Sequence, residues 1–238
     1  MGTSVPSNHT PGKPAHVRTT GTACSRHYGR VTVDGDLVRS ALVRQWHRIA
    51  SAAPLVDLDL HSRVGGWRNR EVLAHLYVQP ILLRRFLLTA PEQSPSVDVT
   101  ANLLGTGAFG ELIDASAREG AELGKFNFAD PLDAALPDLL VADLGVTITT
   151  LQGSIPLVDY LVSRCVEAVV HGEDLVDPVD PDPAAQAITA RALMAVLASK
   201  APHLVPEAER LSSAVWIDVA TGRQPGAGRL ASAVPVMT

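Results

Sequence analysis

The helical spacing of apolar residues most constrains what this chain can fold into. Val38, Leu42, Trp46, Ile49 and Ala53 recur at steps of four, four, three and four, which places them on one face of an α-helix. Hydrophobic residues make up 46% of the chain and aromatic residues only 4%. Ala, Leu and Val therefore supply most of the apolar mass, a composition that favours packed helices over a β-sheet.

Further segments show the same kind of spacing, and the predicted fold is all-α. Four bundle helices are expected at about residues 36–53, 70–88, 109–125 and 157–175, and a fifth helix at about 184–199. The sequence D-P-V-D-P-D-P at 177–183 cannot stay helical and ends the fourth helix.

The segments between these helices carry weaker signals. A linker is expected from the second helix to about Gly107, and residues 131–140 are predicted to form a short helical turn. Residues 146–151, V-T-I-T-T-L, favour β-structure and approach Gly153, so a small hairpin or extended loop is expected there.

A polar stripe interrupts the apolar surface of the fourth helix. Tyr160, Arg164, Glu167 and His171 follow one another at helical steps among Leu, Val, Ala and Cys. Glu167 and His171 are four residues apart, so their side chains lie one above the other and could share a metal ion. Such a stripe either faces solvent or forms a site inside the fold.

The spacing of an acid and a histidine is common by chance. Asp57 and His61 show it, and so do Glu71 and His75. A metal site therefore needs a third ligand from elsewhere in the chain. His75, in the second helical segment, is the candidate; the alternative is a histidine at the edge of the core that bonds a backbone carbonyl.

Two motifs together indicate a family. G-W-x-x-R-E-V-L-A-H-L at 66–76, followed about ninety residues later by D-Y-L-V-S-R-C-V-E-A-V-V-H-G-E-D-L at 159–175, resembles the N-terminal metal-binding domain of mycothiol-dependent maleylpyruvate isomerase. That family belongs to the DinB-like group of helical bundles. The resemblance runs from about residue 34 to 200 and includes A-L-P-D-L-L at 135–140 and the turn at 152–157.

The resemblance implies a DinB-like four-helix bundle with a metal centre. It implies that His75, Glu167 and His171 hold a divalent metal, usually Zn²⁺, and that mycothiol is the thiol cosubstrate. Asp174, one turn beyond His171, either orients its free ring nitrogen or is a solvated helix end. Trp67 is expected to anchor the core, and Cys165 is expected to point away from the metal into the core.

The start of the second helix departs from the family pattern. The family usually has Ser or Thr after the Trp, which forms a capping box with the acid three residues on. Arg68 stands there in this chain, so the box is expected to be lost and Asn69 to cap the helix instead. Pro80, if the helix continues through it, would bend the helix beside His75.

The expected domain division has three parts. Residues 1–33 are predicted to be a disordered tail, 34–182 the metal-binding bundle, and 183–238 a C-terminal helix with a shortened, sterol-carrier-like α/β remnant. Strands are expected at 214–223 and 230–237. In that remnant Arg223 could bind an anion.

Three protein ligands leave a coordination position open, as in catalytic rather than structural zinc sites. A thiol bound there would lose its proton and could attack a small-molecule electrophile, giving S-transfer or isomerisation. Arg164 could bind a substrate carboxylate as a catalytic residue or pair with Glu167. Hydrolysis by bound water, a non-catalytic or regulatory metal-binding domain, and lipid carriage are the alternatives.

Charge and composition limit the other partners. The net charge of −5 gives no general affinity for nucleic acid or anionic membranes. No apolar run reaches the roughly 18 residues that a membrane span needs. The 2 cysteines do not make a disulfide framework, and a reduced, cytoplasmic protein is expected. The sequence does not indicate the oligomeric state.

Overall fold

The computed structural model describes residues 1–2, 33–89 and 94–236, and nearly all of the predicted tail lies outside this range. The four expected bundle helices are present as α1 (Gly35–Ala52), α2 (Asn69–Leu87), α4 (Gly110–Glu122) and α6 (Leu157–Glu173). The fifth helix is α7 (Pro183–Lys200). The all-α prediction is confirmed.

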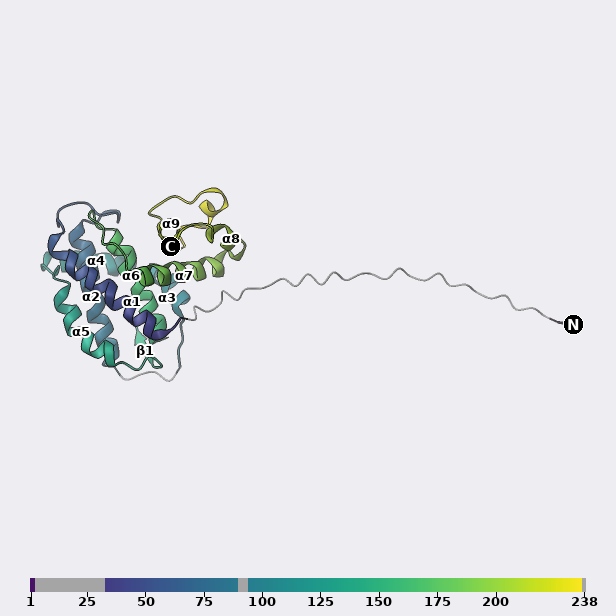
Figure 1. Cartoon of the computed structure of the whole chain (residues 1–238), viewed down its shortest axis with the longest axis horizontal. Coiled ribbons are helices and arrows are strands. Elements are labelled where there is room, and N and C mark those ends of the chain that lie inside the picture. Colours follow the sequence, from purple (N-terminus) through teal and green to yellow (C-terminus); the bar gives the residue numbers. More distant parts are fainter. Residues whose placement is uncertain (3–32, 90–93, 237–238) are drawn as a thin grey trace.

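The bundle forms because each helix buries one apolar face. On α1, Val38, Leu42, Trp46 and Ile49 are completely buried, and the side chain of Asp34 accepts hydrogen bonds from the first free backbone N–H groups. Helix α1 packs against α6, and α6 packs in turn against α7; α2 packs against α4 (Figure 1). Helix α6 thus has neighbours on several sides, which explains its largely buried surface.

The segment predicted as a short helical turn at 131–140 is helical but forms a longer, 13-residue helix, α5 (Ala129–Val141). It packs against α2 and α1. Leu132, Ala135 and Leu139 are buried at helical spacing, and this burial outweighs the cost of Pro137 inside the helix. The expected linker also contains a short helix, α3 (Val99–Gly105), followed by a 3₁₀ helix, η2 (Thr106–Phe109).

The predicted hairpin is confirmed. Strands β1 (Thr147–Thr150) and β2 (Gly153–Pro156) pair antiparallel, with Ile148 opposite Ile155. Gly153 has a φ of +121°, a conformation that side-chain-bearing residues rarely adopt. Helix α6 begins directly after β2, so the hairpin places the start of the helix that carries Glu167 and His171.

The C-terminal segment contains helices where strands were expected. Residues 214–223 fall mainly in α9 (Ser213–Ala220), and the segment predicted as a second strand begins in η4 (Gly228–Ser232); η3 (Pro202–Leu204) and α8 (Val205–Ala208) precede them. Ser212 caps α9, and its Trp216 is buried against α7, with Nε1 donating to the Ala190 carbonyl at 3.0 Å. Tertiary packing overrides the β-propensity of Val and Trp here. The strands of the predicted α/β remnant are therefore wrong.

The start of α2 also differs from expectation. Arg68, not Asn69, is the N-cap residue. Half of the capping box survives, because Glu71 Oε2 accepts a hydrogen bond from the Arg68 N–H at 2.7 Å. Asn69 instead joins two loops: its Nδ2 donates to the Asp57 carbonyl at 2.8 Å, and its Oδ1 accepts from the Val176 N–H at 3.3 Å. Helix α2 continues through Pro80.

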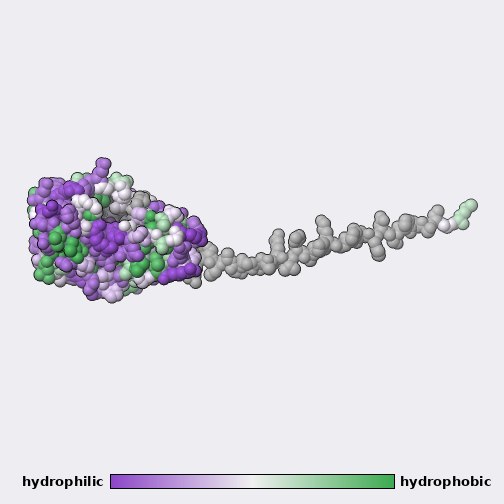
Figure 2. Space-filling model, turned by 90° about the horizontal axis from the view of Figure 1, so that it is seen from above, coloured by the Kyte–Doolittle hydropathy of each residue, from purple (hydrophilic) through white to green (hydrophobic). Residues whose placement is uncertain are grey.

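Among the described residues, no helix combines the length and apolar character needed to cross a bilayer. On the face drawn in Figure 2, hydrophobic residues form small areas among hydrophilic ones.

A further 3₁₀ helix, η1 (Ala53–Leu55), leads from α1 into the loop before α2.

Candidate metal centre

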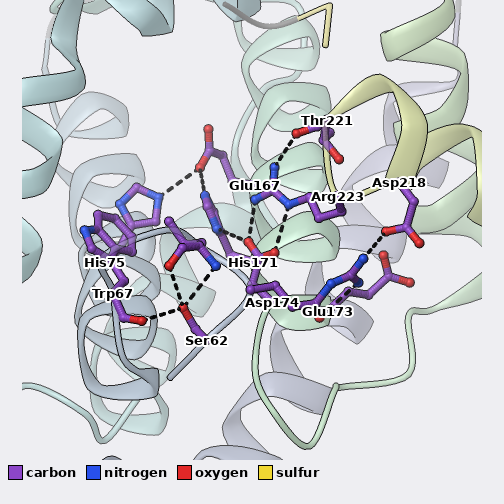
Figure 3. Close-up of polar contacts among 12 residues, drawn as sticks. Ser62, Trp67, His75, Glu167, His171, Glu173, Asp174, Asp218, Thr221 and Arg223 are labelled. Atoms are coloured by element: carbon purple, nitrogen blue, oxygen red, sulfur yellow. Dashed lines mark hydrogen bonds and ion pairs between the residues drawn. The ribbon is translucent and has the colours of Figure 1, made fainter. Parts of the chain in front are cut away.

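His75 from α2 and Glu167 and His171 from α6 meet in the interior of the bundle. Glu167 Oε2 lies 2.9 Å from His75 Nε2 and 3.4 Å from His171 Nε2. The two imidazole centroids are 4.7 Å apart, well within the limit of about 8 Å that a shared ion requires. One nitrogen or oxygen atom from each residue lies within 4.8 Å of the others. Figure 3 shows the Glu167 carboxylate facing both rings.

This set of donor atoms fits a divalent metal of the zinc type. Imidazole nitrogens with a carboxylate oxygen are ordinary zinc ligands. His75 and Glu167 are 7% exposed and thus shielded from bulk solvent. A carboxylate placed this deep against two imidazoles from separate helices is a costly arrangement unless positive charge balances it.

The pKa values reflect the close contact of the three groups. Burial lowers the pKa of His75, so this imidazole is neutral and able to donate a lone pair. Burial alone would raise the pKa of Glu167, but hydrogen bonds from His171 and His75 hold it well below its usual value. Glu167 is therefore an anion throughout the physiological range.

Asp174 is buried and orients His171, so the alternative that it is only a solvated residue at the end of α6 is excluded. Asp174 is fully buried, and its Oδ2 lies 2.8 Å from His171 Nδ1. This contact leaves Nε2 facing Glu167 (Figure 3). Burial would lower the pKa of His171, but Asp174 and Glu167 together raise it to about 9.

Arg223 holds Asp174 from the C-terminal segment. Its Nε donates to Asp174 Oδ1 at 2.9 Å and its Nη2 to Oδ2 at 2.5 Å, while its Nη1 donates to the Thr221 carbonyl at 2.9 Å (Figure 3). Burial would raise the pKa of Asp174, but Arg223 and then His171 lower it to about 2. The guanidinium that was expected to bind an anion thus pairs with a carboxylate of the protein itself.

Trp67 forms one wall of the site. It is 6% exposed, which confirms its role in the core. Its ring also lies 5.7 Å from the His75 ring and 6.3 Å from the His171 ring. Its Nε1 donates to Asp114 Oδ1 on α4 at 2.6 Å. Trp67 therefore fixes the position of both imidazoles relative to α4.

Arg164 lies one helical turn before Glu167 on α6. In the part of the chain that the structure describes, its guanidinium forms no ion pair with the Glu167 carboxylate. Its Nη1 donates to Gln79 Oε1, and its Nε and Nη2 lie 3.4 and 3.3 Å from Ser163 Oγ. Its guanidinium carbon sits 4.7 Å from the centre of the Tyr160 ring. A direct ion pair with Glu167, one of the two alternatives for Arg164, is thus not observed, although the charge of Arg164 helps to lower the pKa of Glu167.

Cys165 points away from this centre, as predicted. Its Sγ is fully buried and lies 4.0 Å from the Val38 carbonyl oxygen on α1. Burial raises the pKa of this thiol far above its usual value. Cys165 is therefore a core residue and neither a ligand nor a nucleophile.

Comparison with known proteins identifies the family. The family model described as "Mycothiol maleylpyruvate isomerase N-terminal domain" matches residues 39–176, more than half of the chain. The chain belongs to this family. A solved structure described as the crystal structure of the mycothiol-dependent maleylpyruvate isomerase is similar at 16% identity and a TM-score of 0.46, over 68% of this chain and 68% of that chain. Curated proteins give no significant match.

The residues of this mycothiol maleylpyruvate isomerase N-terminal domain include every predicted ligand. His75, Glu167 and His171 lie inside the matched range, and so do Arg164 and Asp174. The all-α bundle agrees with the DinB-like architecture that the resemblance implied. Arg223 lies beyond the matched range, so the contact that holds Asp174 comes from a part of the chain that the family model does not cover.

Sequence reasoning missed Gln79. Its Nε2 lies 3.3 Å from His75 Nε2, and its Oε1 accepts from Arg164. Because Gln79 follows His75 by four residues on α2, the spacing rule that linked Glu167 to His171 would have found it.

Proposed function

We propose that the chain is a metal-dependent enzyme that activates a low-molecular-weight thiol, with mycothiol as the thiol, for S-transfer or isomerisation of a small electrophile. His75, Glu167 and His171 would hold the metal, and Zn²⁺ suits their donor atoms. The observation that carries the proposal is the meeting of these donor atoms from two helices beside a cavity. When bound, zinc supplies a Lewis acid that favours the deprotonated form of a coordinated thiol.

The chain's own residues would prepare the site in three ways. Asp174 holds His171 with Nε2 directed at the centre. Trp67 packs beside both imidazoles and would limit the access of water from that side. Arg164, on the cavity wall, would bind an anionic group of the substrate and fix its position relative to Glu167.

Metal binding is tested by zinc content and thermal unfolding of wild type, His171→Ala and His61→Ala. His61 has the same acid spacing but is exposed, so it is the matched control. Zinc at about 100 times its Kd stabilises the state that binds it by about 2.7 kcal/mol, which corresponds to roughly 5–10 °C in a chain of this size. We expect this shift in wild type and His61→Ala but not in His171→Ala. If none of the three proteins contains zinc and added zinc raises none of their melting midpoints, the proposed metal centre is wrong.

The thiol step needs its own assay. Zinc-loaded protein is incubated with mycothiol and either maleylpyruvate or a chlorodinitrobenzene, and isomerisation or thioether formation is followed by absorbance. We expect turnover that requires both zinc and mycothiol and that His171→Ala abolishes. Zinc binding without any thiol-dependent turnover would instead support the alternative of a non-catalytic or regulatory metal-binding domain.

A further inference from the structure

A cavity of about 320 Å³ adjoins the candidate metal centre and is lined by His75 and Glu167. Helices α2 and α6, the segment from α3 to α4, and the turn between β1 and β2 supply its walls. This volume is at the lower end of the range for small-molecule sites. It can therefore take a small organic molecule in contact with the metal ligands.

Apolar side chains cover much of this cavity. Val78, Leu82 and Phe86 form a stripe on α2 that starts one turn after His75, and Phe109, Leu112 and Ile113 come from η2 and α4. The core-facing residues Leu73, Leu76 and Leu83 of α2 are completely buried, whereas the stripe residues stay partly exposed. The stripe thus presents apolar surface that the fold itself does not cover, and a ligand with an apolar body would cover it.

Arg164 is the cation on the cavity wall. Gln79, Ser163 and Tyr160 contact its guanidinium, and these groups carry no negative charge. Both histidines contact the Glu167 carboxylate, the negative group on the same wall. Within the described residues this partly buried guanidinium makes no direct ion pair, although its charge acts on Glu167, so it can still bind a carboxylate, whose two oxygens match the planar fork of Arg.

Three layers follow one another along α2 and α6. Glu167 faces His75 at the metal centre, Arg164 contacts Gln79 in the next layer, and Tyr160 meets Phe86 beyond it, with ring centroids 5.6 Å apart. Neighbouring layers are separated by three or four residues on α6, which corresponds to roughly 5–6 Å along the helix axis. The cation therefore lies between the metal centre and the apolar end of the cavity.

From this order, and resting on the function proposed above, we propose that the electrophile is a small monocarboxylate with an apolar body. Its carboxylate would bind Arg164, and its apolar body would extend between the α2 stripe and α4 toward Phe86. The reactive carbon would then lie close to the carboxylate, within about one helical turn of it, on the side of His75 and Glu167. A dianion with no apolar body would leave the stripe uncovered.

The test compares three unreactive probes by calorimetry with the full chain. Phenylbutyrate has both expected features, phenylbutyramide lacks the charge, and succinate lacks the apolar body. The titrations are made with zinc bound and again in chelator, because a carboxylate can also bind zinc directly. We expect phenylbutyrate to bind at least tenfold more tightly than either other probe in both conditions.

Variants then assign the two features. Arg164→Gln should weaken phenylbutyrate at least tenfold and leave phenylbutyramide unchanged, and Arg164→Lys should restore part of the affinity. Leu82→Ser should weaken both aromatic probes. Arg84→Gln is the matched control, because Arg84 pairs with Asp138 on the exposed surface, and it should change nothing. Circular dichroism spectra and melting midpoints like those of wild type ensure that each variant is folded.

The outcomes separate this inference from the proposed function. Tighter binding of succinate than phenylbutyrate, or no effect of Arg164→Gln in chelator, overturns the inference even if thiol-dependent turnover is observed. Binding of phenylbutyrate that depends on Arg164, found in a protein without thiol-dependent turnover, supports the cavity assignment while the proposed function fails.

Discussion

Replacing Asp174 with Asn removes the charge that joins His171 to Arg223 and keeps the shape of the side chain. In wild type this carboxylate is completely buried and contacts both positively charged partners. The Asn side chain keeps one oxygen that can accept a hydrogen bond, but it offers no charge. We therefore expect Asp174→Asn to destabilise the metal-free protein.

The pKa of Asp174 sets the expected magnitude. It falls from an ordinary value of 3.8 to about 2, and each unit corresponds to about 1.4 kcal/mol, so the charged form contributes about 2.5 kcal/mol to the free energy of unfolding. Loss of one partner of a buried ion pair costs roughly 3–5 kcal/mol. The side chains of Arg223 and His171 are 19% and 17% exposed. Water can therefore partly solvate them after the substitution, and about 2 kcal/mol is the expected cost.

The loss should depend on pH in a definite direction. The folded pKa of Asp174 is depressed, so its contribution is complete above pH about 4 and disappears as the pH falls through about 2. The folded pKa of His171 is raised to about 9, so its contribution is complete below pH about 6.5 and disappears as the pH rises through about 9. The difference in the free energy of unfolding between wild type and variant is therefore largest between about pH 4 and 6.5. Above about pH 9 only the contribution of the ion pair between Asp174 and Arg223 remains.

Urea unfolding in chelator, followed by circular dichroism, measures this difference at several pH values. At pH 6 a cost of about 2 kcal/mol corresponds to roughly 4–8 °C in melting midpoint. Asp138→Asn is the control, because its ion pair with Arg84 is partly exposed and is worth at most about 1 kcal/mol. If Asp174→Asn costs no more than this control, or costs the same at every pH, the buried ion-pair argument is refuted.

The remaining predictions concern the same centre and the core beside it. Zinc affinity should rise about tenfold per pH unit from about pH 7 and level off near pH 9, because His171 must lose a proton whose pKa is about 9; calorimetry in buffers of different ionisation enthalpy should count about one released proton. Arg223→Ala should lower zinc affinity by about tenfold, and Arg223→Lys by less, measured by competition with a chromogenic chelator, because Asp174 then loses the group that holds it. In a Cys24→Ser background, the buried Cys165 should react with a thiol reagent only after unfolding in urea; rapid labelling of the native protein would contradict the packing of α6 on α1.

The sequence predicted the bundle and the residues that meet at the candidate metal centre, because both depend on helical spacing. The apolar residues of α1 and α6 repeat with the period of an α-helix, and both segments are helical in the structure. Glu167 and His171 therefore lie on one face of α6, as their spacing predicts. His75 could be added because a second motif supported it. The distance between these two segments, however, is a property of the packing of α2 against α6, which no spacing within one helix reveals.

The failures have a common physical cause. Residues 214–220 carry Val, Trp and Ile, which favour strands in isolation, but burial of Trp216 against α7 makes them helical. In α5, burial of Leu132 and Leu139 likewise outweighs Pro137. The pairing of Arg223 with Asp174 spans 49 residues and depends on where α9 ends, so no local pattern could predict it.

The contact between Arg223 and Asp174 has a thermodynamic consequence for the whole molecule. A free energy that couples two sites acts equally in both directions. If docking of the segment after α9 strengthens the hold on a ligand at His171, then a ligand at His171 must strengthen the docking of that segment by the same factor. Cleavage or displacement of the chain near Arg223 would loosen the ligand, and a bound ligand would protect that turn from proteolysis. Protection of the turn after α9 from proteolysis would therefore indicate whether a ligand occupies the centre inside the bundle.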